Sequence, residues 1–248
     1  MGTEEEKKTN INNFKLIVMK KNRIWIYPLY TLGIFIMFLS ISFKSDAQVS
    51  SATVKDIDGN VYKTVKIDTQ VWMAENVKTT KYNDGTPIPL VTDDNAWESI
   101  TTPAYCWHKN DATANKNTYG ALYNWDAVNS NKLCPTGWHV PSDVEWSTLI
   151  TFLGSESIAG GKLKEAGTAH WISPNTGTTN ESGFTALPGG YRDYDGTFGG
   201  VGDNGFWWSS TDYSSSNGSS LDISYDGISI HWSHGDKQDG FSVRCIKD

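Results

Sequence analysis

The sequence is short of cysteine, and this limits how the chain can be cross-linked. Three cysteines occur in 248 residues, Cys106, Cys134 and Cys245. Three thiols allow at most one bridge within the chain and leave one thiol over, so a scaffold held by several disulfides is excluded. None of them lies just after the N-terminal hydrophobic segment, which argues against a lipid-anchored lipoprotein.

Positive charge is also scarce outside the first 47 residues. The whole chain has a formal net charge of −7; removing residues 1–47 takes away seven basic and four acidic residues, leaving 14 against 24 and a net charge of −10. A domain of this kind repels phosphate backbones and anionic lipid. We therefore expect no nucleic-acid partner, and contact with a membrane only through the N-terminal segment.

Familiar catalytic motifs are missing as well. The sequence contains no G-x-S-x-G, no H-E-x-x-H and no Cys/His spacing typical of a nucleophile and its base. Glu75, Asp126, Glu145 and Arg192 could line a cleft, although Glu145 is better explained as a helix-capping acid and Arg244 as a partner for surface carboxylates. The sequence favours a protein that is not an enzyme, and it predicts no cofactor.

One long uncharged run is present, at residues 24–43, directly after a group of basic residues. A start at Met19 would give a basic region, an apolar region and a small-x-small cleavage site at 45–47, as in a signal peptide. We predict that Met19 is the true start and that cleavage follows Ala47. The alternative is an uncleaved anchor formed by the same run. Both place residues 48–248 outside the inner membrane: periplasmic, at the cell surface or extracellular.

Residues 48–248 have the composition and patterning of one globular domain rich in β-structure. Asp58-Gly59-Asn60 and Asp226-Gly227 lie between extended runs and predict hairpin turns. In the final strand, Cys245 shares a face with apolar residues and is expected to be buried. The second hairpin predicts three pairs on an apolar face and two on a polar face. The apolar pairs are Tyr225–Ile228, Ile223–Ile230 and Leu221–Trp232, and the polar pairs are Ser224–Ser229 and Asp222–His231.

Helices are expected in the middle of the domain. The spacing of apolar residues predicts one over 119–129, and a stronger one begins at a capping box formed by Ser142 and Glu145 and ends near Gly154. A short third helix is predicted over 161–166, whereas residues 93–118 read mainly as loop. Together these features predict a single α+β domain with a twisted, mostly antiparallel sheet, two main helices and long loops rich in Gly and Trp.

Eight segments follow one another between Asp56 and Asp248: DIDGNVYKTVKI, QVWMAENVK, YGALYNWDAV, CPTGWHVPSDVEW, GKLKEAG, GFTALPGGYR, FWWSST and GFSVRCIKD. Together they resemble the Fibrobacter succinogenes major paralogous domain, a family found in exported proteins of Bacteroidetes and Fibrobacter relatives. The resemblance covers essentially all of residues 48–248, but it implies little about function because the family's activity is largely undefined.

A more distant resemblance concerns the fold. The stretch from Cys134 to Trp138, the helix after it and the closing Arg244-Cys245 are similar to the C-type lectin fold. They are also similar to its relatives, the formylglycine-generating enzymes and the variable receptor-binding proteins of diversity-generating retroelements. The resemblance implies a bridge between Cys134 and Cys245, with Cys106–Cys134 as the alternative. The calcium-binding motifs of lectins and the closely spaced cysteine pair of formylglycine-generating enzymes are absent.

Aromatic residues suggest carbohydrate binding, because exposed rings stack on sugars and neighbouring polar groups bind hydroxyls. Ten tryptophans follow Ala47. We expect Trp72, Trp138, Trp146, Trp207 and Trp232 to lie mainly in the core. The residues expected at the surface are the ligand-binding candidates Tyr213, Asn217, Asp222, His231 and His234.

Three further motifs have simpler explanations than ligand binding. The Asp56-x-Asp58-Gly59-Asn60 sequence lacks the later ligands of a calcium loop and reads as a hairpin turn. The pair His231-x-x-His234 lacks a third ligand, so no metal site is predicted. Residues 200–205 match G-x-G-x-x-G, but the segment after them reads as extended rather than helical, which excludes a dinucleotide loop.

The sequence thus predicts an exported binding module whose ligand is a glycan. The first alternative is a protein-interaction or adhesin module with a surface protein as its partner. The second is an enzyme with a fold similar to formylglycine-generating enzymes but without their cysteine pair.

Overall fold

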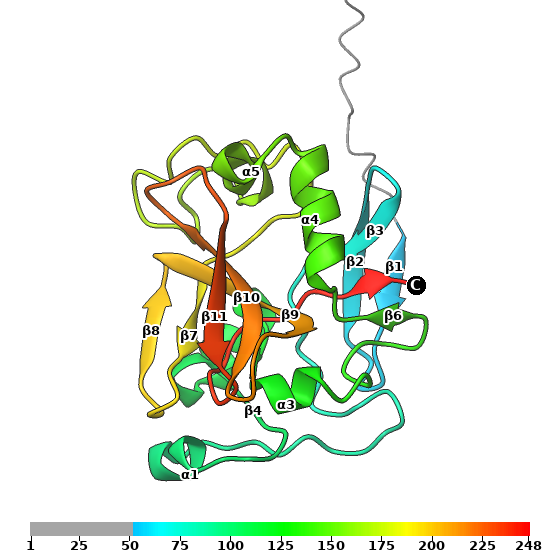
Figure 1. Ribbon diagram of the computed structural model, residues 1–248, viewed down its shortest axis with the longest axis vertical. Helices are drawn as coiled ribbons and strands as arrows, with labels where there is room; N and C mark the ends of the chain where they lie inside the picture. The colour runs from blue at the N-terminus through cyan, green and yellow to red at the C-terminus, as the bar shows by residue number, and fades with distance from the viewer. Residues whose placement is uncertain (1–51) are drawn as a thin grey trace, which may run out of the picture. The chain divides into compact units, whose positions relative to one another are not determined.

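The computed structural model describes residues 52–248, which form an α+β domain dominated by strands (Figure 1). Neighbouring strands are mostly antiparallel, as predicted, with a parallel pairing between β7 (Gly189–Arg192) and β9 (Asn204–Asp212). The strands form three sheets, whereas we expected one. The predicted targeting region, residues 1–47 with its uncharged run 24–43, lies outside the described residues.

The first sheet joins the beginning of the domain to its end. The hairpin predicted around Asp58-Gly59-Asn60 is confirmed, because the strands on either side pair with Val54 opposite Tyr62. Gly59 has a φ of 88°, a value that favours glycine at this turn. In spatial order the sheet contains β1 (Thr53–Lys55), β2 (Val61–Ile67), β3 (Gln70–Met73), β12 (Ile246–Lys247) and β6 (Trp138–His139).

The second sheet contains the predicted C-terminal hairpin. Its register is confirmed at Leu221–Trp232 and Asp222–His231, but the pairing expected nearer the turn does not form a ladder. The backbone groups that would form it bond elsewhere: Tyr225 N–H donates to the Asp203 carbonyl oxygen, and Ile230 N–H donates to that of Glu156. The spatial order is β11 (His231–Asp236), β10 (Asn217–Ser224), β9, β7 and β8 (Phe198–Val201).

The Gly-rich stretch 200–205 lies at the turn between β8 and β9 of this sheet. The segment after it is a strand, as expected, so the geometry that a dinucleotide loop requires is absent from this turn. The third sheet is a two-stranded pair of β4 (Tyr105–Cys106) and β5 (Leu122–Tyr123).

The main helix is α4 (Asp143–Phe152), and it begins as predicted. Glu145 accepts a hydrogen bond of 2.8 Å from the backbone N–H of Ser142, which completes the capping box. Gly154 follows with a φ of 119°. The helix α5 (Glu156–Leu163) begins earlier than the predicted 161–166. It packs closely on the next hairpin, because a Cβ at Gly160 would lie 2.3 Å from the Ser229 carbonyl oxygen.

The helix predicted over 119–129 is wrong. Gly120 has a φ of 80° and ends the preceding helix at Tyr119. The chain then forms β5, and Asn124 caps a new short helix by accepting from the N–H of Ala127. No helix within residues 52–248 is long and apolar enough to cross a membrane. The other helical segments are α1 (Asp94–Glu98), a 3-10 turn at His108–Asn110, α2 (Ala112–Tyr119) and α3 (Trp125–Val128).

Two of these segments, α1 and α2, occupy a region that the sequence predicted as loop. Each begins at an aspartate, Asp93 or Asp111, whose side chain accepts a hydrogen bond from the N–H three residues later. Local capping therefore forms them. Because α2 buries none of its side chains, it shows no apolar periodicity by which it could have been recognised.

The core consists of two large aromatic clusters on opposite faces of β9. Successive side chains of a strand point to opposite faces, so Trp207 and Trp208 enter different clusters. Trp207 packs in the cluster that contains Trp72 and Trp146, and Trp208 packs in the cluster that contains Tyr123. The large aromatic content of the sequence is therefore used mainly to fill the interior.

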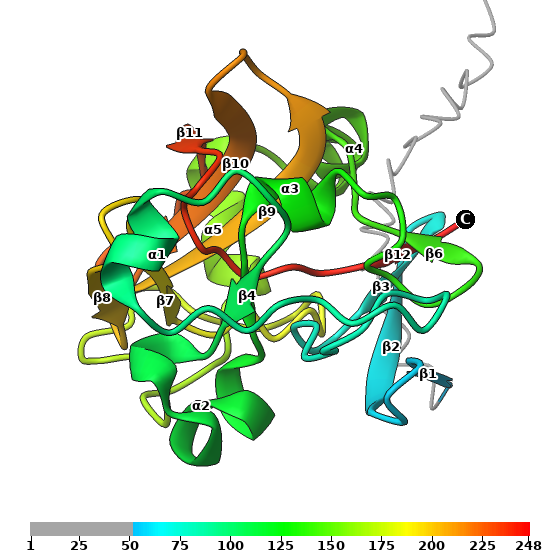
Figure 2. The same ribbon diagram turned by 90° about the horizontal axis from the view of Figure 1, so that it is seen from below.

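The closing segment, residues 240–247, joins all three sheets. Its backbone bonds Tyr123 of β5 at Phe241, Trp208 of β9 at Ser242, and Met73 of β3 at Cys245. Its final residues form β12 inside the first sheet. Both views show this red segment passing between the sheets (Figures 1 and 2).

A disulfide anchors the closing segment and confirms the pairing implied by the fold resemblance. Cys134 and Cys245 are bonded, with their Cα atoms 6.0 Å apart and a sequence separation of 111. Cys106 is a free thiol, and the Cys106–Cys134 alternative is wrong. Burial raises the pKa of Cys106 to about 12, so this thiol is protonated and unreactive at neutral pH.

Arg244 lies in the interior, and its expected pairing with surface carboxylates is wrong. The side chain is 1% exposed, and its guanidinium donates to Asn76 Oδ1 and to the carbonyl oxygens of Met73, Phe184 and Thr185. Burial lowers the pKa of Arg244 to about 9. The sequence correctly predicted that apolar and polar side chains alternate along this strand. Both faces of the strand are covered by other segments, however, so its polar side chains are buried too.

Replacing Arg244 with methionine should destabilise the domain strongly. Arg244→Met removes the guanidinium donor from three carbonyl oxygens and from Asn76 Oδ1, which keeps only its bond from the Trp207 indole N–H, at a cost of about 3 kcal/mol or more in the free energy of unfolding. Urea unfolding followed by fluorescence measures the change. Lys247→Met in the same segment is the control, because Lys247 is exposed and should change stability by no more than about 0.5 kcal/mol. Equal stability of the two variants would contradict the role assigned to Arg244.

Removing the disulfide should also lower stability. Closing a loop of this length contributes roughly 4–5 kcal/mol on the chain-entropy estimate, which is an upper figure. The double variant Cys134→Ala/Cys245→Ala should unfold at a lower temperature than the wild type. A thiol reductant should lower the melting temperature of the wild type and leave that of the double variant unchanged; a wild type insensitive to reductant would refute this assignment.

Candidate functional site

Three of the five predicted ligand-binding residues come together at one end of the second sheet. The rings of Tyr213 and His234 stack, with centroids 3.4 Å apart and planes 8° from parallel. Asn217 lies at the start of β10 and donates to Asp236 Oδ1 at 3.0 Å. Tyr213 is 58% exposed although one face of its ring covers His234, so the opposite face and the ring edge are open to solvent.

The other two predicted residues form a separate pair on the opposite face of the sheet. Asp222 and His231 are partners across β10 and β11, whereas His234 pairs with Ser219. Partners in a ladder share a face and successive residues alternate, so a separation of three places His231 and His234 on opposite faces. Burial raises the pKa of Asp222, and the nearby His231 opposes this shift. The five residues are therefore two groups, and their role in binding stays a prediction.

Trp232 belongs to the first group, although the sequence placed it in the core. It lies two residues before His234 and so on the same face of β11, and it is only partly buried. Its indole N–H donates to Glu156 Oε1 at 3.0 Å, which fixes the ring against the start of α5. The period-two spacing of Trp232 and His234 was visible in the sequence and could have linked them.

We call Tyr213, Asn217, Trp232, His234 and Asp236 the β11 aromatic surface. It joins the hairpin between β9 and β10 to the edge strand β11, at the front of the molecule in Figure 1. It offers a free ring face, imidazole and amide groups, and a carboxylate. These groups suit the stacking and hydrogen bonding of a polyhydroxylated ligand.

Most other tryptophans are unavailable for binding. Of the ten in residues 52–248, eight are buried, including the predicted core residues Trp72, Trp146 and Trp207. Trp138 and Trp232 are the exceptions among the described tryptophans, because both are partly exposed. The expectation of core positions is thus confirmed for three of the five named residues, whereas Trp138 and Trp232 pack against the core clusters and remain partly exposed.

The acidic hairpin predicted as a plain turn uses its carboxylates internally. Asp56 accepts from the Tyr62 hydroxyl at 2.6 Å and from the Asn60 backbone N–H at 2.8 Å. Asp58 accepts from the Thr80 N–H at 2.6 Å and forms an ion pair with a lysine. In the part of the chain that the structure describes, no three acidic, histidine or cysteine side chains are grouped to hold a metal ion.

The residues considered for a catalytic cleft are dispersed. Glu75 follows β3, Asp126 lies in α3, Glu145 in α4 and Arg192 in β7. Glu145 is engaged at its helix N-terminus, and Arg192 is fully buried with an ion pair of 2.7 Å to Asp94. These four side chains do not form one constellation in which an acid and a base could act on a common substrate.

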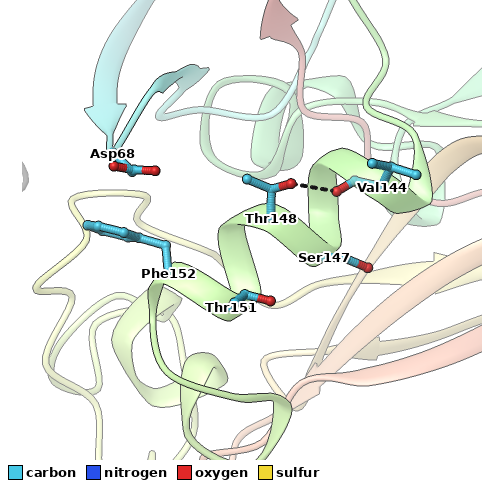
Figure 3. Close-up of a pocket in the computed structure, with 6 residues that line it drawn as sticks. All are labelled: Asp68, Val144, Ser147, Thr148, Thr151 and Phe152. Carbon is cyan, nitrogen blue, oxygen red and sulfur yellow. Dashed lines mark hydrogen bonds between the residues drawn. The ribbon is translucent and has the colours of Figure 1, made fainter.

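A hollow of about 440 Å³ lies beside α4 and is shown in Figure 3. Asp68, at the turn between β2 and β3, is the charged residue of this lining, and Val144 at the other end is 74% exposed. The Thr148 hydroxyl donates back to the Val144 carbonyl oxygen at 2.8 Å, so it is occupied within the helix. The hollow lacks convergent polar groups. Its lining is completed by Ser147, Thr151 and Phe152.

Asp239, which lies near the β11 aromatic surface, has a raised pKa. Burial, and then the charges of Asp193 and Asp236, raise the pKa of Asp239 to about 7. Its Oδ1 atom is buried and has no hydrogen-bond partner among the described residues. Ionised Asp239 therefore destabilises the folded domain at neutral and alkaline pH.

This arrangement predicts how stability changes with pH. Asp239 binds a proton more tightly in the folded state than in the unfolded state, so its contribution decreases as pH rises from about 4 to about 7. Asp239→Asn should remove this decrease and stabilise the domain at pH 8 by roughly 1 kcal/mol or more relative to wild type. Denaturant unfolding at pH 5 and pH 8 tests it. If the variant shows the same difference between the two pH values as wild type, the assignment is wrong.

Comparison with known proteins places the chain in a family without adding a function. Neither a curated protein nor a solved structure matches it. The family model described as the Fibrobacter succinogenes major domain matches residues 65–247, which include the closing segment, the disulfide and the β11 aromatic surface. The chain therefore belongs to the Fibrobacter succinogenes major domain family.

Proposed function

We propose that this protein is an exported glycan-binding module and that the β11 aromatic surface holds the sugar. The observation that carries the proposal is the exposed Tyr213 ring, stacked on His234 and on the same sheet edge as the partly exposed Trp232. A sugar ring packs its C–H face on such rings while its hydroxyls bind polar side chains at the margin.

The rigidity of this surface supports the assignment. Tyr213 is held by its stack on His234, Asn217 by Asp236, and Trp232 by its hydrogen bond to Glu156. Side chains already fixed in one conformation lose little entropy when a ligand binds. The uncharged run 24–43 supports export, with residues 48–248 in the periplasm, at the cell surface or outside the cell.

We also propose that the fold is similar to C-type lectins. The bond between Cys134 and Cys245 supports this, because it ties the stretch before the main helix to the closing segment. A shared fold does not by itself assign a ligand, since unrelated functions occur on one fold. The glycan proposal therefore depends on the surface residues.

A second function is supported by one feature, the position of β11 at the edge of the second sheet. An edge strand can pair with an extended segment of another protein, which would make the domain an adhesin or interaction module. Such binding would use backbone groups and would not require the open face of Tyr213.

Binding of neutral oligosaccharides distinguishes the two functions. The purified full chain should change its tryptophan fluorescence with at least one member of a cello-, xylo- and manno-oligosaccharide panel. Trp232→Ala and Tyr213→Ala should each weaken that binding by about tenfold, since each removes a ring of the surface. Trp138→Ala, which alters the other partly exposed described tryptophan, is the matched control and should bind as wild type.

Two results would overturn the glycan assignment. One is the absence of a response to every sugar in the panel at millimolar concentration, together with capture of a defined surface protein whose binding survives Tyr213→Ala. The other is sugar binding that both aromatic substitutions leave unchanged. Melting temperatures of all variants, measured in parallel, separate loss of binding from loss of folding.

A further inference from the structure

A second hollow lies at the open end of one face of the first sheet, whereas the β11 aromatic surface lies on the second sheet. Its volume is about 390 Å³, within the range of roughly 300–1,000 Å³ that is typical of ligand pockets. Val54 of β1 and Trp138 of β6 both line it, and these strands are the two edges of the sheet. We call it the Trp138 cradle.

Strand register explains which side chains reach the cradle. Lys66 pairs with Val71, and Lys247 pairs with Trp138. Ile246 pairs with Trp72, so the next residue along the antiparallel strand, Lys247, lies opposite Val71. A single row therefore crosses four strands on one face: Lys66, Val71, Lys247 and Trp138.

The cradle lies at the open end of this face, because Tyr62, Met73 and Cys245 further along the same face are buried in an aromatic cluster against which Trp138 packs. Val65, Trp72 and Ile246 alternate with the cradle residues along their strands and are all buried in the core. Lys66 and Lys247 are exposed, and Trp138 is partly exposed. The cradle is therefore open to solvent, with an aliphatic floor at Val71 and an indole at one edge.

The two lysines and the indole N–H of the cradle have no partner within residues 52–248, whereas the Thr64 hydroxyl donates to the Ala52 carbonyl oxygen. There, neither Lys66 nor Lys247 forms an ion pair, and the indole N–H of Trp138 has no hydrogen-bond acceptor. The Trp138 ring has no aromatic or cationic partner among the same residues. The other partly exposed described tryptophan, Trp232, differs because its N–H is already bonded to Glu156.

The charge of the cradle is opposite to that of the domain. Residues 48–248 carry a net charge of −10, yet the lining of this hollow contains two lysines and no carboxylate. The neighbouring Asp248 does not line the hollow, and its carboxylate is already bonded, because its Oδ1 lies 2.6 Å from His139 Nδ1. A local positive site on an acidic domain attracts a small anion while the rest of the surface repels large polyanions such as nucleic acids.

From this juxtaposition we propose that the Trp138 cradle binds a uronic-acid residue of an acidic polysaccharide. The Trp138 indole stacks on the sugar ring, and the ammonium groups of Lys66 and Lys247 pair with the carboxylate. Val54 and Val71 cover the apolar edge of the sugar. The site lies on a different sheet from the β11 aromatic surface, so it does not depend on the function proposed above.

Titration of the purified full chain with a tetragalacturonate tests this inference. Wild type should bind it, and affinity should decrease as salt rises from 50 to 500 mM, because the contact is ionic and exposed. The fully methyl-esterified tetramer keeps the rings and loses the charge, and it should bind about tenfold more weakly. Calorimetry measures both affinities without relying on tryptophan fluorescence.

Variants assign the binding to the cradle. Trp138→Ala and the double variant Lys66→Gln/Lys247→Gln should each weaken tetragalacturonate binding by about tenfold or more. Lys63→Gln is the matched control, because Lys63 is an exposed lysine of the same strand whose side chain points to the opposite face from Lys66. It should bind as wild type. Melting temperatures confirm that each variant is folded.

The outcomes separate the two proposals. Tetragalacturonate binding that requires Trp138 and both lysines supports the cradle, whatever the neutral sugars do. No binding at millimolar concentration, equal binding of the methyl ester, or equal loss in Lys63→Gln overturns it. If binding appears only after the residues before Ala52 are removed, the chain's own N-terminal segment is the occupant, and the proposal of a polysaccharide site in the full chain is wrong.

Discussion

The structure depends on the closing segment, which is buried from Gly240 to Ile246. Its backbone bonds strands from all three sheets, and its Cys245 is fixed to Cys134 by a disulfide. The guanidinium of Arg244 satisfies carbonyl groups from distant parts of the chain without a carboxylate partner in contact. A buried charge is costly unless it is fully hydrogen-bonded. The arrangement is therefore stable only when β3, the 184–185 loop and the closing segment are all in place.

The closing segment explains how a domain with short strands and long loops presents a rigid surface. β12 and β6 each contain two residues, and such strands contribute few ladder bonds of their own. The closing segment holds them together, so edge residues such as Trp138 stay in register. At the other end of the molecule, β11 is fixed by its ladder with β10 and by the hydrogen bond between Trp232 and Glu156. Both proposed binding surfaces thus include edge strands that are held in place by contacts with the rest of the domain.

The two surfaces differ in chemistry because the same residue types meet different neighbours. Trp232 lies beside Glu156 and two residues from His234, and this surface suits a neutral, hydroxyl-rich ligand. Trp138 lies beside lysines and aliphatic side chains, which suits an acidic sugar. Eight other tryptophans of the described chain fill the core. The number of tryptophans therefore says little about binding, and the charge and exposure of the surroundings decide it.

The sequence by itself determined features that depend on local chemistry. The capping box at Ser142, the turn at Gly59, the register at Leu221–Trp232 and the family motifs follow from short-range spacing. Tertiary structure decided what depends on distant partners. The burial of Arg244, the exposure of Trp138 and Trp232, the separation of His231 from His234, and the division into three sheets all arise because segments far apart in sequence cover some faces and leave others open. Side-chain type fixes what a residue can bond, but only packing fixes which groups are within reach.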